Sequence, residues 1–307
     1  MSAGPEWMWI ALSMFAVVMQ TVRTAAQKHI TQHLDPIGAT MVRFVFGLPF
    51  AVIFLWFVVL HYDLQIPALH REFVVFSSIA AVLQIVATVL LIYLFSLRNF
   101  AVGTTYARTE AFLTALIGSI FFGELISIGG WAAIFVSVAG VIVLTAARTE
   151  VLSSGSLLSR LWSKSALVGV AAGLSFAVCS LSLRRASLSF GHENYLFTAG
   201  MVLVAMIVIQ IFITGLYMVF RSPHQFLIIA QQWKVSLFIG LTSALGSIGW
   251  FTAMTLERAS YVKALGQAEF LFALLISTLF FRERTTALEL GGMALVAAGI
   301  GMLLLWG

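Results

Sequence analysis

Ten apolar segments, each close to the length of a membrane-spanning helix, follow one another along the chain. A helix needs about 20 apolar residues to cross the hydrocarbon core of a bilayer. The segments that meet this condition are 7–25, 36–60, 73–97, 101–122, 128–147, 166–183, 195–220, 235–256, 260–281 and 287–306. They have helical length, and they lack the short alternation of barrel strands. The sequence therefore predicts an all-α integral membrane protein with ten transmembrane helices.

The composition agrees with this class. Hydrophobic residues make up 61% of the 307 residues and charged residues 9%, whereas a soluble domain carries about a quarter charged residues. The net charge of +5 would suggest nucleic acid binding in a soluble chain. Here Lys and Arg fall mainly between the apolar segments, where they act as flanking charges. A single cysteine, Cys179, excludes an intramolecular disulfide. The opening "MSAGPEWMW" has neither a basic region nor a cleavage site, so we expect no removable signal peptide.

The two halves of the chain resemble each other in one constant register. The stretches "TTYARTEAFLTALIGSIFFGE" (104–124) and "KALGQAEFLFALLISTLFFRE" (263–283) align without a gap. This alignment, which we call the repeat register, places Glu110 opposite Glu269, near the helix centres. It also places Glu124 opposite Glu283 at helix ends, where we expect a turn or capping role.

A polar stretch near the midpoint separates these halves. We predict a first five-helix repeat at 1–150, a linker at 151–164 and a second five-helix repeat at 165–307. Because five is odd, equivalent helices would cross the membrane in opposite directions. Inverted repeats of this kind are common in secondary transporters, which bind their substrate near the midplane between the repeats.

Glu110 and Glu269 lie near the middle of the fourth and ninth predicted helices. At a rise of about 1.5 Å per residue, this puts them close to the bilayer centre. A charge there costs roughly 3 kcal/mol, and desolvation favours the neutral carboxyl group unless a cation is near. Such groups could take up and release protons, as proton-coupled transport requires. In the alternative interpretation they are protonated or ion-paired and only tie helices together.

Basic and amide groups accompany both glutamates. Arg108 lies two residues before Glu110 and so points to a different side of the helix, whereas Tyr106 shares the side of Glu110. Gln267 occupies the position of Arg108 in the second half, before Glu269. A zwitterionic ligand would suit this arrangement, with its carboxylate at the arginine and its amine at the glutamate. The alternative is that Arg108 pairs with a polar group of a neighbouring helix.

Further polar or aromatic residues interrupt the helices. Trp250 could bind an amine or an aromatic ring on its flat face, and Gln84 and Tyr93 could line a cavity. Arg43, in the second helix, could contact substrate, although snorkelling or pairing within the bundle is the simpler interpretation. The small residues of "GLTSALGSIG" (240–249) could let helices approach closely or could form the wall of a cavity.

Enzyme signatures are weak. The six histidines lie outside the helix centres and form no recognised metal motif. The chain carries neither a phosphate-binding loop nor a nucleophile and base in register. We therefore expect no enzymatic activity, metal or cofactor. A structural or channel-like membrane protein is the remaining class, and the paired midplane acids of an inverted repeat favour a carrier over it.

Several features together resemble one known family. They are the five plus five helices, Arg43 in "MVRFVFGLPFA", the mid-helix glutamates, "GE" and "RE" closing those helices, and "SIGWFTAMTLERASYVKALGQAEF". This combination resembles the EamA type of the drug/metabolite transporter superfamily. The resemblance implies a carrier of small metabolites, often an exporter. Family members often have Pro after the mid-helix Glu, but Ala111 and Phe270 stand there, so no kink is assumed.

Taken together, we expect a secondary active transporter of a bacterial inner membrane. It would export a small amine-bearing metabolite such as an amino acid by alternating access, coupled to protons, as a monomer or dimer that binds no nucleic acid. The alternative is facilitated uptake of a zwitterionic or cationic solute without proton coupling. Five Lys and Arg lie on the side of the termini and ten on the other. This count places the termini outside the cytoplasm, whereas the family resemblance, which we follow, places them inside.

Overall fold

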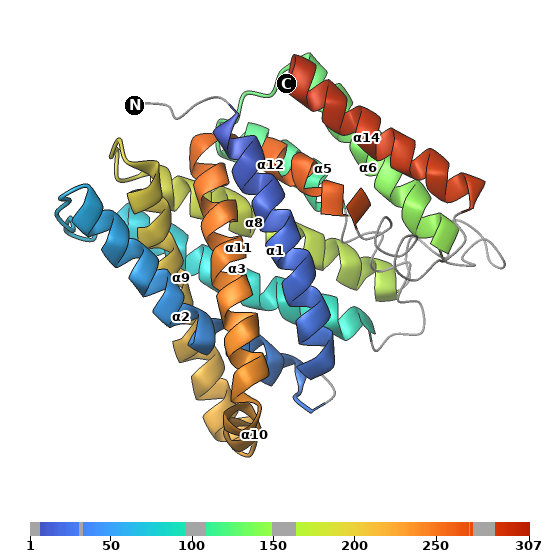
Figure 1. The fold of residues 1–307 in the computed structure, drawn as a ribbon. Helices are drawn as coiled ribbons and strands as arrows, with labels where there is room; N and C mark the ends of the chain where they lie inside the picture. Colours follow the sequence, from blue (N-terminus) through green and yellow to red (C-terminus); the bar gives the residue numbers. More distant parts are fainter. Residues whose placement is uncertain (1–6, 31–32, 96–108, 149–163, 270, 273–285) are drawn as a thin grey trace. The chain divides into compact units, whose positions relative to one another are not determined.

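The structure is a computed structural model, and it describes residues 7–30, 33–95, 109–148, 164–269, 271–272 and 286–307. Every regular element in these ranges is an α-helix (Figure 1). The helices are α1 (Met8–Ile30), α2 (Pro36–His61), α3 (Arg71–Phe95), α5 (Glu110–Phe121), α6 (Ile128–Arg148), α8 (Lys164–Leu188), α9 (Tyr195–Arg221), α10 (Gln225–Gln231), α11 (Trp233–Leu256), α12 (Ala259–Gly266) and α14 (Ala287–Trp306). Within the described ranges, six helices are long and apolar enough to cross a membrane, namely those in α2, α3, α8, α9, α11 and α14. The predicted all-α membrane class is confirmed.

Most helices lie close to their predicted bounds. The ends of α2, α6, α9, α11 and α14 fall within two residues of the prediction, whereas α1 and α8 each run five residues further. The short helix α10 was not predicted. The fourth predicted helix is described only from Thr109 onward, as α5.

The ninth predicted helix is interrupted. Helix α12 ends at Gly266, and Gln267 forms a turn in which its N–H donates to the carbonyl oxygen of Ala264 at 3.2 Å. Residues 268–269 are helical again. The helix expected over 260–281 therefore contains a one-residue turn at Gln267, directly after a glycine, which is a poor helix former. The backbone of Gln267 stays in the right-handed α region, with φ −64° and ψ −13°, and the helical course resumes at the next residue.

The chain forms two compact units, and each unit draws on both halves of the sequence. Unit 1 consists of Met1–Ile85 and Ser182–Glu257, and unit 2 of Val86–Leu181 and Arg258–Gly307. Unit 1 contains α1, α2, α9 and α11, and unit 2 contains α5, α6, α12 and α14. The units therefore do not correspond to the two halves of the sequence.

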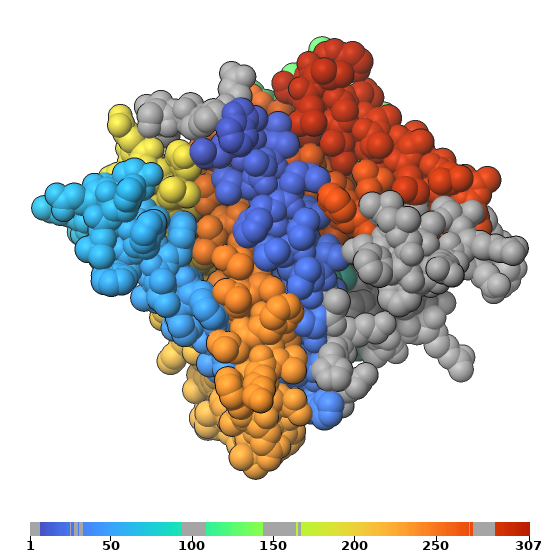
Figure 2. All heavy atoms as spheres, in the orientation of Figure 1, coloured from blue at the N-terminus to red at the C-terminus, as the bar shows by residue number. Residues whose placement is uncertain are grey.

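In unit 1, α11 packs against α1, α2 and α9, and α2 also packs against α9. Figure 2 shows α1 and α11 side by side along one face of this unit. Glycine makes the closest of these approaches possible: a Cβ added to Gly240 would lie 2.4 Å from the carbonyl carbon of Phe46 in α2. Because lipid is as apolar as the side chains, such close backbone packing is a main source of cohesion between membrane helices.

In unit 2, α6 and α14 pack along their length in opposite directions (Figure 1). The start of α6 meets the end of α14, where Ser127 Oγ donates to the carbonyl oxygen of Trp306 at 3.0 Å. Further along, a Cβ on Gly299 would lie 2.6 Å from Ser137 N, and a Cβ on Gly140 would lie 2.6 Å from Val296 N. Gly140 and Gly299 are equivalent in the repeat register, so both halves contribute a glycine to the same helix contact.

The repeat register also governs where helices begin. Asp35 caps α2 by accepting from Gly38 N at 2.7 Å, and its equivalent Asn194 caps α9 by accepting from Phe197 N at 3.0 Å. Ser127 and its equivalent Thr286 cap α6 and α14 through Gly130 N at 2.8 Å and Glu289 N at 3.2 Å. Side-chain oxygens at this position satisfy N–H groups that have no partner within the helix. The repeat register therefore holds in helix capping as well as in sequence.

Helices α2 and α9 also run antiparallel. A Cβ on Gly200, near the start of α9, would lie 3.2 Å from Leu55, in the second half of α2. Further along α9, the Thr214 hydroxyl lies 2.9 Å from the sulfur of Met41, near the start of α2. In each of two pairs of equivalent helices, α2 with α9 and α6 with α14, the two helices thus pack side by side and antiparallel. Each pair lies within its own unit.

Candidate functional site

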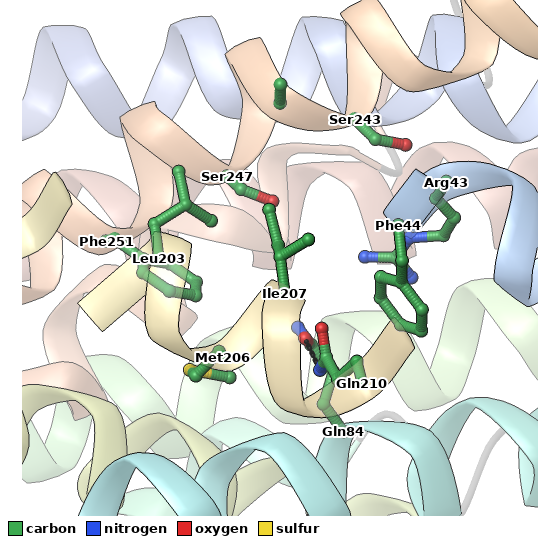
Figure 3. Close-up of a pocket in the computed structure, with 11 residues that line it drawn as sticks. Arg43, Phe44, Gln84, Leu203, Met206, Ile207, Gln210, Ser243, Ser247 and Phe251 are labelled. Atoms are coloured by element: carbon green, nitrogen blue, oxygen red, sulfur yellow. Dashed lines mark hydrogen bonds between the residues drawn. The ribbon is translucent and has the colours of Figure 1, made fainter. Parts of the chain in front are cut away.

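Unit 1 contains a pocket of about 280 Å³ between α2, α3, α9 and α11, part of it open to the outside (Figure 3). Its polar lining comes from Arg43, Gln84, Gln210, Ser243 and Ser247. Its apolar lining comes from Phe44, Leu203, Met206, Ile207, Ala244 and Phe251. Figure 3 shows Arg43 and Phe44 at one end of the pocket, and Phe251, Leu203 and Met206 towards the other. Arg43 therefore marks one end of the pocket, which we call the polar end, and three apolar side chains lie towards the other.

The polar end is held in place by hydrogen bonds and ring contacts. Gln210 Nε2 donates to Gln84 Oε1 at 2.7 Å and also to the carbonyl oxygen of Ala81 at 3.3 Å. The Arg43 guanidinium lies 5.3 Å from the centre of the Phe44 ring, within the range of a cation–π contact. The Arg43 side chain is buried. The prediction that Gln84 lines a cavity is confirmed, and Arg43 lies in the same pocket.

The small-residue stretch 240–249 both packs closely against neighbouring helices and forms part of the pocket wall. Its glycines allow close packing, since Gly240 meets α2, and Gly246 and Gly249 meet α1. Ser243, Ala244 and Ser247, which share a helix face with Gly240, line the pocket. A helix built this way brings its backbone near two neighbours while keeping hydroxyl groups on the side of the cavity.

Unit 2 contains the first of the two mid-helix glutamates. Glu110 is the first residue of α5, and its Oε1 lies 3.7 Å from Nζ of Lys263 in α12. The exposed fractions of the two side chains are 25% and 16%, respectively. The Lys263 ammonium also lies 5.7 Å from the centre of the Phe176 ring. The sequence did not indicate Lys263 as a partner of Glu110, because the two residues lie in opposite halves of the chain.

The second glutamate lies beside the turn that follows α12. Glu269 is partly buried, and Gln267, two residues earlier, has an exposed fraction of 6%. Neither amide atom of Gln267 has a hydrogen-bond partner among the described residues. A buried amide without partners is costly in an apolar environment, so this position suits a polar ligand group.

Other candidates differ in their outcomes. Trp250 Nε1 donates to Gln20 Oε1 at 3.1 Å and so joins α11 to α1. It is not among the residues that line the pocket, and its contact with substrate stays a prediction. Tyr93, at the end of α3, has its ring 5.5 Å from Lys164 Nζ. Arg108 and Tyr106 lie outside the described residues, so their predicted roles also stay predictions.

Glu124 has the capping role expected for it. Its carboxylate accepts from Ala259 N at 2.8 Å and from Ser260 N and Oγ at 3.4 and 3.0 Å, at the start of α12. The side chain is buried. A carboxylate at a helix N-terminus satisfies unpaired N–H groups and complements the helix dipole. The matching Glu283 lies outside the described residues.

Comparisons with known proteins agree with this architecture. The model of the EamA-like transporter family matches the chain twice, at residues 7–146 and 163–305. No match was found among curated proteins. Among solved structures, one described only as the crystal structure of a protein aligns with 97% of this chain and 99% of its own, with a TM-score of 0.71 and 15% sequence identity. That likeness concerns the fold alone. The chain belongs to the EamA-like transporter family of the drug/metabolite transporter superfamily, and it is a multi-pass membrane transporter of a small molecule.

Proposed function

We propose that this protein is a proton-coupled secondary transporter that exports a small amine-bearing metabolite, such as an amino acid, across a bacterial inner membrane. The observation that carries the proposal is the contact between Glu110 and Lys263, at 3.7 Å within an apolar bundle. An ammonium group already sits beside this carboxylate. The site therefore has the chemistry to hold a substrate amine in its place.

The proposed architecture is two inverted five-helix repeats at 1–150 and 165–307, joined by the linker 151–164. The capping residues at equivalent positions of the repeat register support it, as does the antiparallel packing of α2 with α9 and of α6 with α14. In such a carrier the two repeats rearrange about a central site, which opens to one side of the membrane at a time.

The mechanism rests on exchange between three cations at one carboxylate. A desolvated Glu110 is stabilised by the Lys263 ammonium, by a bound proton or by a substrate amine. Each of them relieves the same cost, so they compete, and binding of one shifts the population of the others. Competition between proton and amine is what couples solute movement to the proton gradient.

The two glutamates have different roles in this proposal. Lys263 has Thr104 at its equivalent position in the first half, and Gln267 has Arg108. The repeats thus share their acids but not the cationic groups beside them. Both glutamates exchange protons in this proposal; Glu269, preceded by the neutral Gln267, is assigned to hold its proton more readily, and Glu110 to contribute more to binding the amine.

Transport by purified protein in sealed vesicles with an imposed pH gradient tests the proposal. A panel of L-amino acids and simple amines would be scanned for solute-evoked proton movement with a trapped pH dye. We expect Glu269→Gln to abolish pH-driven transport, and Glu110→Gln to weaken the apparent affinity for the solute, while both variants stay folded in the membrane. If both variants transported normally with unchanged pH dependence, the carboxylates would only hold helices together and the mechanism would be wrong.

The second candidate is facilitated uptake of a zwitterionic or cationic solute without proton coupling. The same ion pair favours it in one respect, because a glutamate already neutralised by Lys263 does not require a proton. The vesicle assay separates the two: a facilitated carrier would equilibrate its solute at a rate and extent indifferent to the pH gradient.

A further inference from the structure

We infer that the short helix α10 lies at the membrane–water interface and forms a binding site for an anionic phospholipid. In this site Arg221 and Lys234 contact the lipid phosphate, and exposed apolar side chains of α10 contact the acyl chains. Three observations carry the inference: the position of α10, its exposed apolar face and the distribution of charge around it. The site lies on the surface of unit 1, and its existence does not depend on the proposed transport mechanism.

Helix α10 lies where α9 ends and α11 begins, at one end of unit 1 (Figure 1). Both of these helices, and α2, are long and apolar enough to cross a membrane. The start of α2 lies beside α10, because Gln225 Oε1 accepts from the backbone N–H of Asp35, the capping residue of α2, at 3.2 Å. A spanning helix ends where the hydrocarbon gives way to the headgroups. Three such helix ends therefore place α10 at the level of the headgroups.

One face of α10 is fixed against the protein. Gln225 and Ile229, one helical turn apart, are buried, and Ile229 belongs to a core cluster with residues of α1, α2, α9 and α11. The opposite face carries Phe226 and Leu227, whose exposed fractions are 38% and 65%. Because the buried face holds the helix in place, these two apolar side chains point outward in a fixed direction.

The exposed apolar surface continues from α10 onto both neighbouring helices. Phe220, in the last turn of α9, is exposed, and so are Trp233 and Leu237 in the first turns of α11. Tryptophan is enriched where membrane proteins cross the interface. A continuous exposed apolar surface of this kind marks contact with lipid. The outer face of α10 thus extends the lipid-facing surface of unit 1 to the headgroup level.

The charge around α10 is positive. The segment 195–256, which includes α9, α10 and α11, contains no Asp or Glu, and its Lys and Arg residues are Arg221 and Lys234 alone. These two residues flank α10 in the chain, and both side chains are exposed. The Lys234 ammonium lies 5.8 Å from the centre of the Trp233 ring, so it is held beside an aromatic ring of the interface.

The acid that lies closest to α10 among the described residues is engaged in the fold. Asp35 accepts from Gly38 N at 2.7 Å and from Ser222 Oγ at 3.3 Å, one bond to each carboxylate oxygen. Two exposed cations beside an exposed apolar face match the anionic phosphate and the acyl chains of a phospholipid. A zwitterionic headgroup would bring a cation of its own to a segment that has no acid to receive it, so we assign the site to an anionic lipid.

The test is local fluorescence quenching of the purified full-length protein in bilayers. Cys179, the one cysteine of the chain, is buried, so a bimane label can be directed to Leu227→Cys. The bilayers mix phosphatidylglycerol with phosphatidylcholine, and one lipid or the other carries bromine on its acyl chains. The ratio of the two quenching curves gives the relative affinity of the two lipids at position 227. We expect phosphatidylglycerol to be preferred roughly fivefold or more, since each cation near the surface contributes about fivefold.

Two double variants of equal charge change make the test specific. Arg221→Gln combined with Lys234→Gln should remove the preference for phosphatidylglycerol. Arg71→Gln combined with Arg185→Gln removes two exposed cations of unit 1 that do not flank α10, and it should leave the preference unchanged. All four side chains are exposed, so we expect the variants to fold.

Two further label positions calibrate the quenching. Val208 is exposed in the middle of α9, so a label on Val208→Cys should be quenched equally by the two lipids. Gln65 is exposed in the connection between α2 and α3, so a label on Gln65→Cys should be quenched by aqueous iodide and not by lipid.

Three results would overturn the inference. The first is equal quenching by the two lipids at position 227, and the second is an equal loss of preference in the two double variants. The third is a label at position 227 that neither lipid quenches, because water, a second copy of the chain or another protein would then cover α10. The measurement involves neither transport nor a pH gradient, so each of these results leaves the proposed function untouched.

Discussion

Replacing Gly299 with alanine should separate α6 from α14 and destabilise unit 2. The new Cβ would lie 2.6 Å from the backbone nitrogen of Ser137, whereas ordinary contacts begin near 3.4 Å. A backbone atom cannot rotate away, so the helices must move apart by roughly 0.8 Å, which forfeits about a quarter to a half of the dispersion energy of the contacts nearby. Overpacking of this kind costs about 1–3 kcal/mol, more than the gain of up to about 1 kcal/mol in helix propensity.

Gly301→Ala is the matched control for this substitution. Gly301 lies on the same helix two residues later, and a Cβ there would meet nothing within 4 Å. It should therefore be neutral or slightly stabilising, because alanine is the better helix former. In thermal unfolding of the purified protein, Gly299→Ala should melt several degrees below the wild type and Gly301→Ala should not. Equal melting temperatures for the two variants would refute the close α6–α14 contact. The equivalent Gly140→Ala should behave like Gly299→Ala.

Two further predictions concern charged groups at helix ends. Arg184 Nη1 donates to the carbonyl oxygens of Met254 and Glu257 at the end of α11, so Arg184→Gln should cost about 1.5–3 kcal/mol in thermal unfolding. The adjacent Arg185 pairs with Glu72 at an exposed site, so Arg185→Gln should cost less than about 1 kcal/mol. Equal losses of unfolding free energy in the two variants would show that Arg184 does not cap the helix. Glu124→Ala should cost about 2 kcal/mol by leaving two backbone N–H groups of α12 without their acceptor, and an unchanged melting curve would contradict that role.

Helix positions were predictable from sequence where local chemistry marks them. Asp35 followed by Pro36 is a capping residue before a proline at the first helical position, and α2 begins there. Thr286 with Glu289 forms a capping box, and α14 begins where predicted. The turn at Gln267 was not predicted, because an apolar run with one glycine looks continuous in sequence. The composition of each unit from both halves was not predictable either, since it depends on contacts between distant helices.

The candidate site was predictable only in part, for a similar reason. A glutamine in the middle of an apolar helix is conspicuous, and Gln84 does line the pocket; the same signal in Gln210 was overlooked. The sequence of 240–249 allowed two roles, close helix packing or lining a cavity, and its small residues alone do not show which of them line the pocket. The contact of Lys263 with Glu110 joins side chains from opposite halves of the sequence. No local spacing indicates it, and only the fold brings these two side chains together.

Glu110 and Glu124 belong to the same segment, yet their partners give them different capacities. The carboxylate oxygens of Glu124 are matched to backbone N–H groups at the start of α12, which cannot move away while that helix exists. Its charge is therefore permanently satisfied, and it serves the fold. Glu110 is matched to a flexible lysine side chain, whose ammonium can leave the carboxylate without unfolding any helix. A carboxylate can exchange a proton or a substrate amine only if its present partner can withdraw, so our proposal places this exchange at Glu110 and not at Glu124.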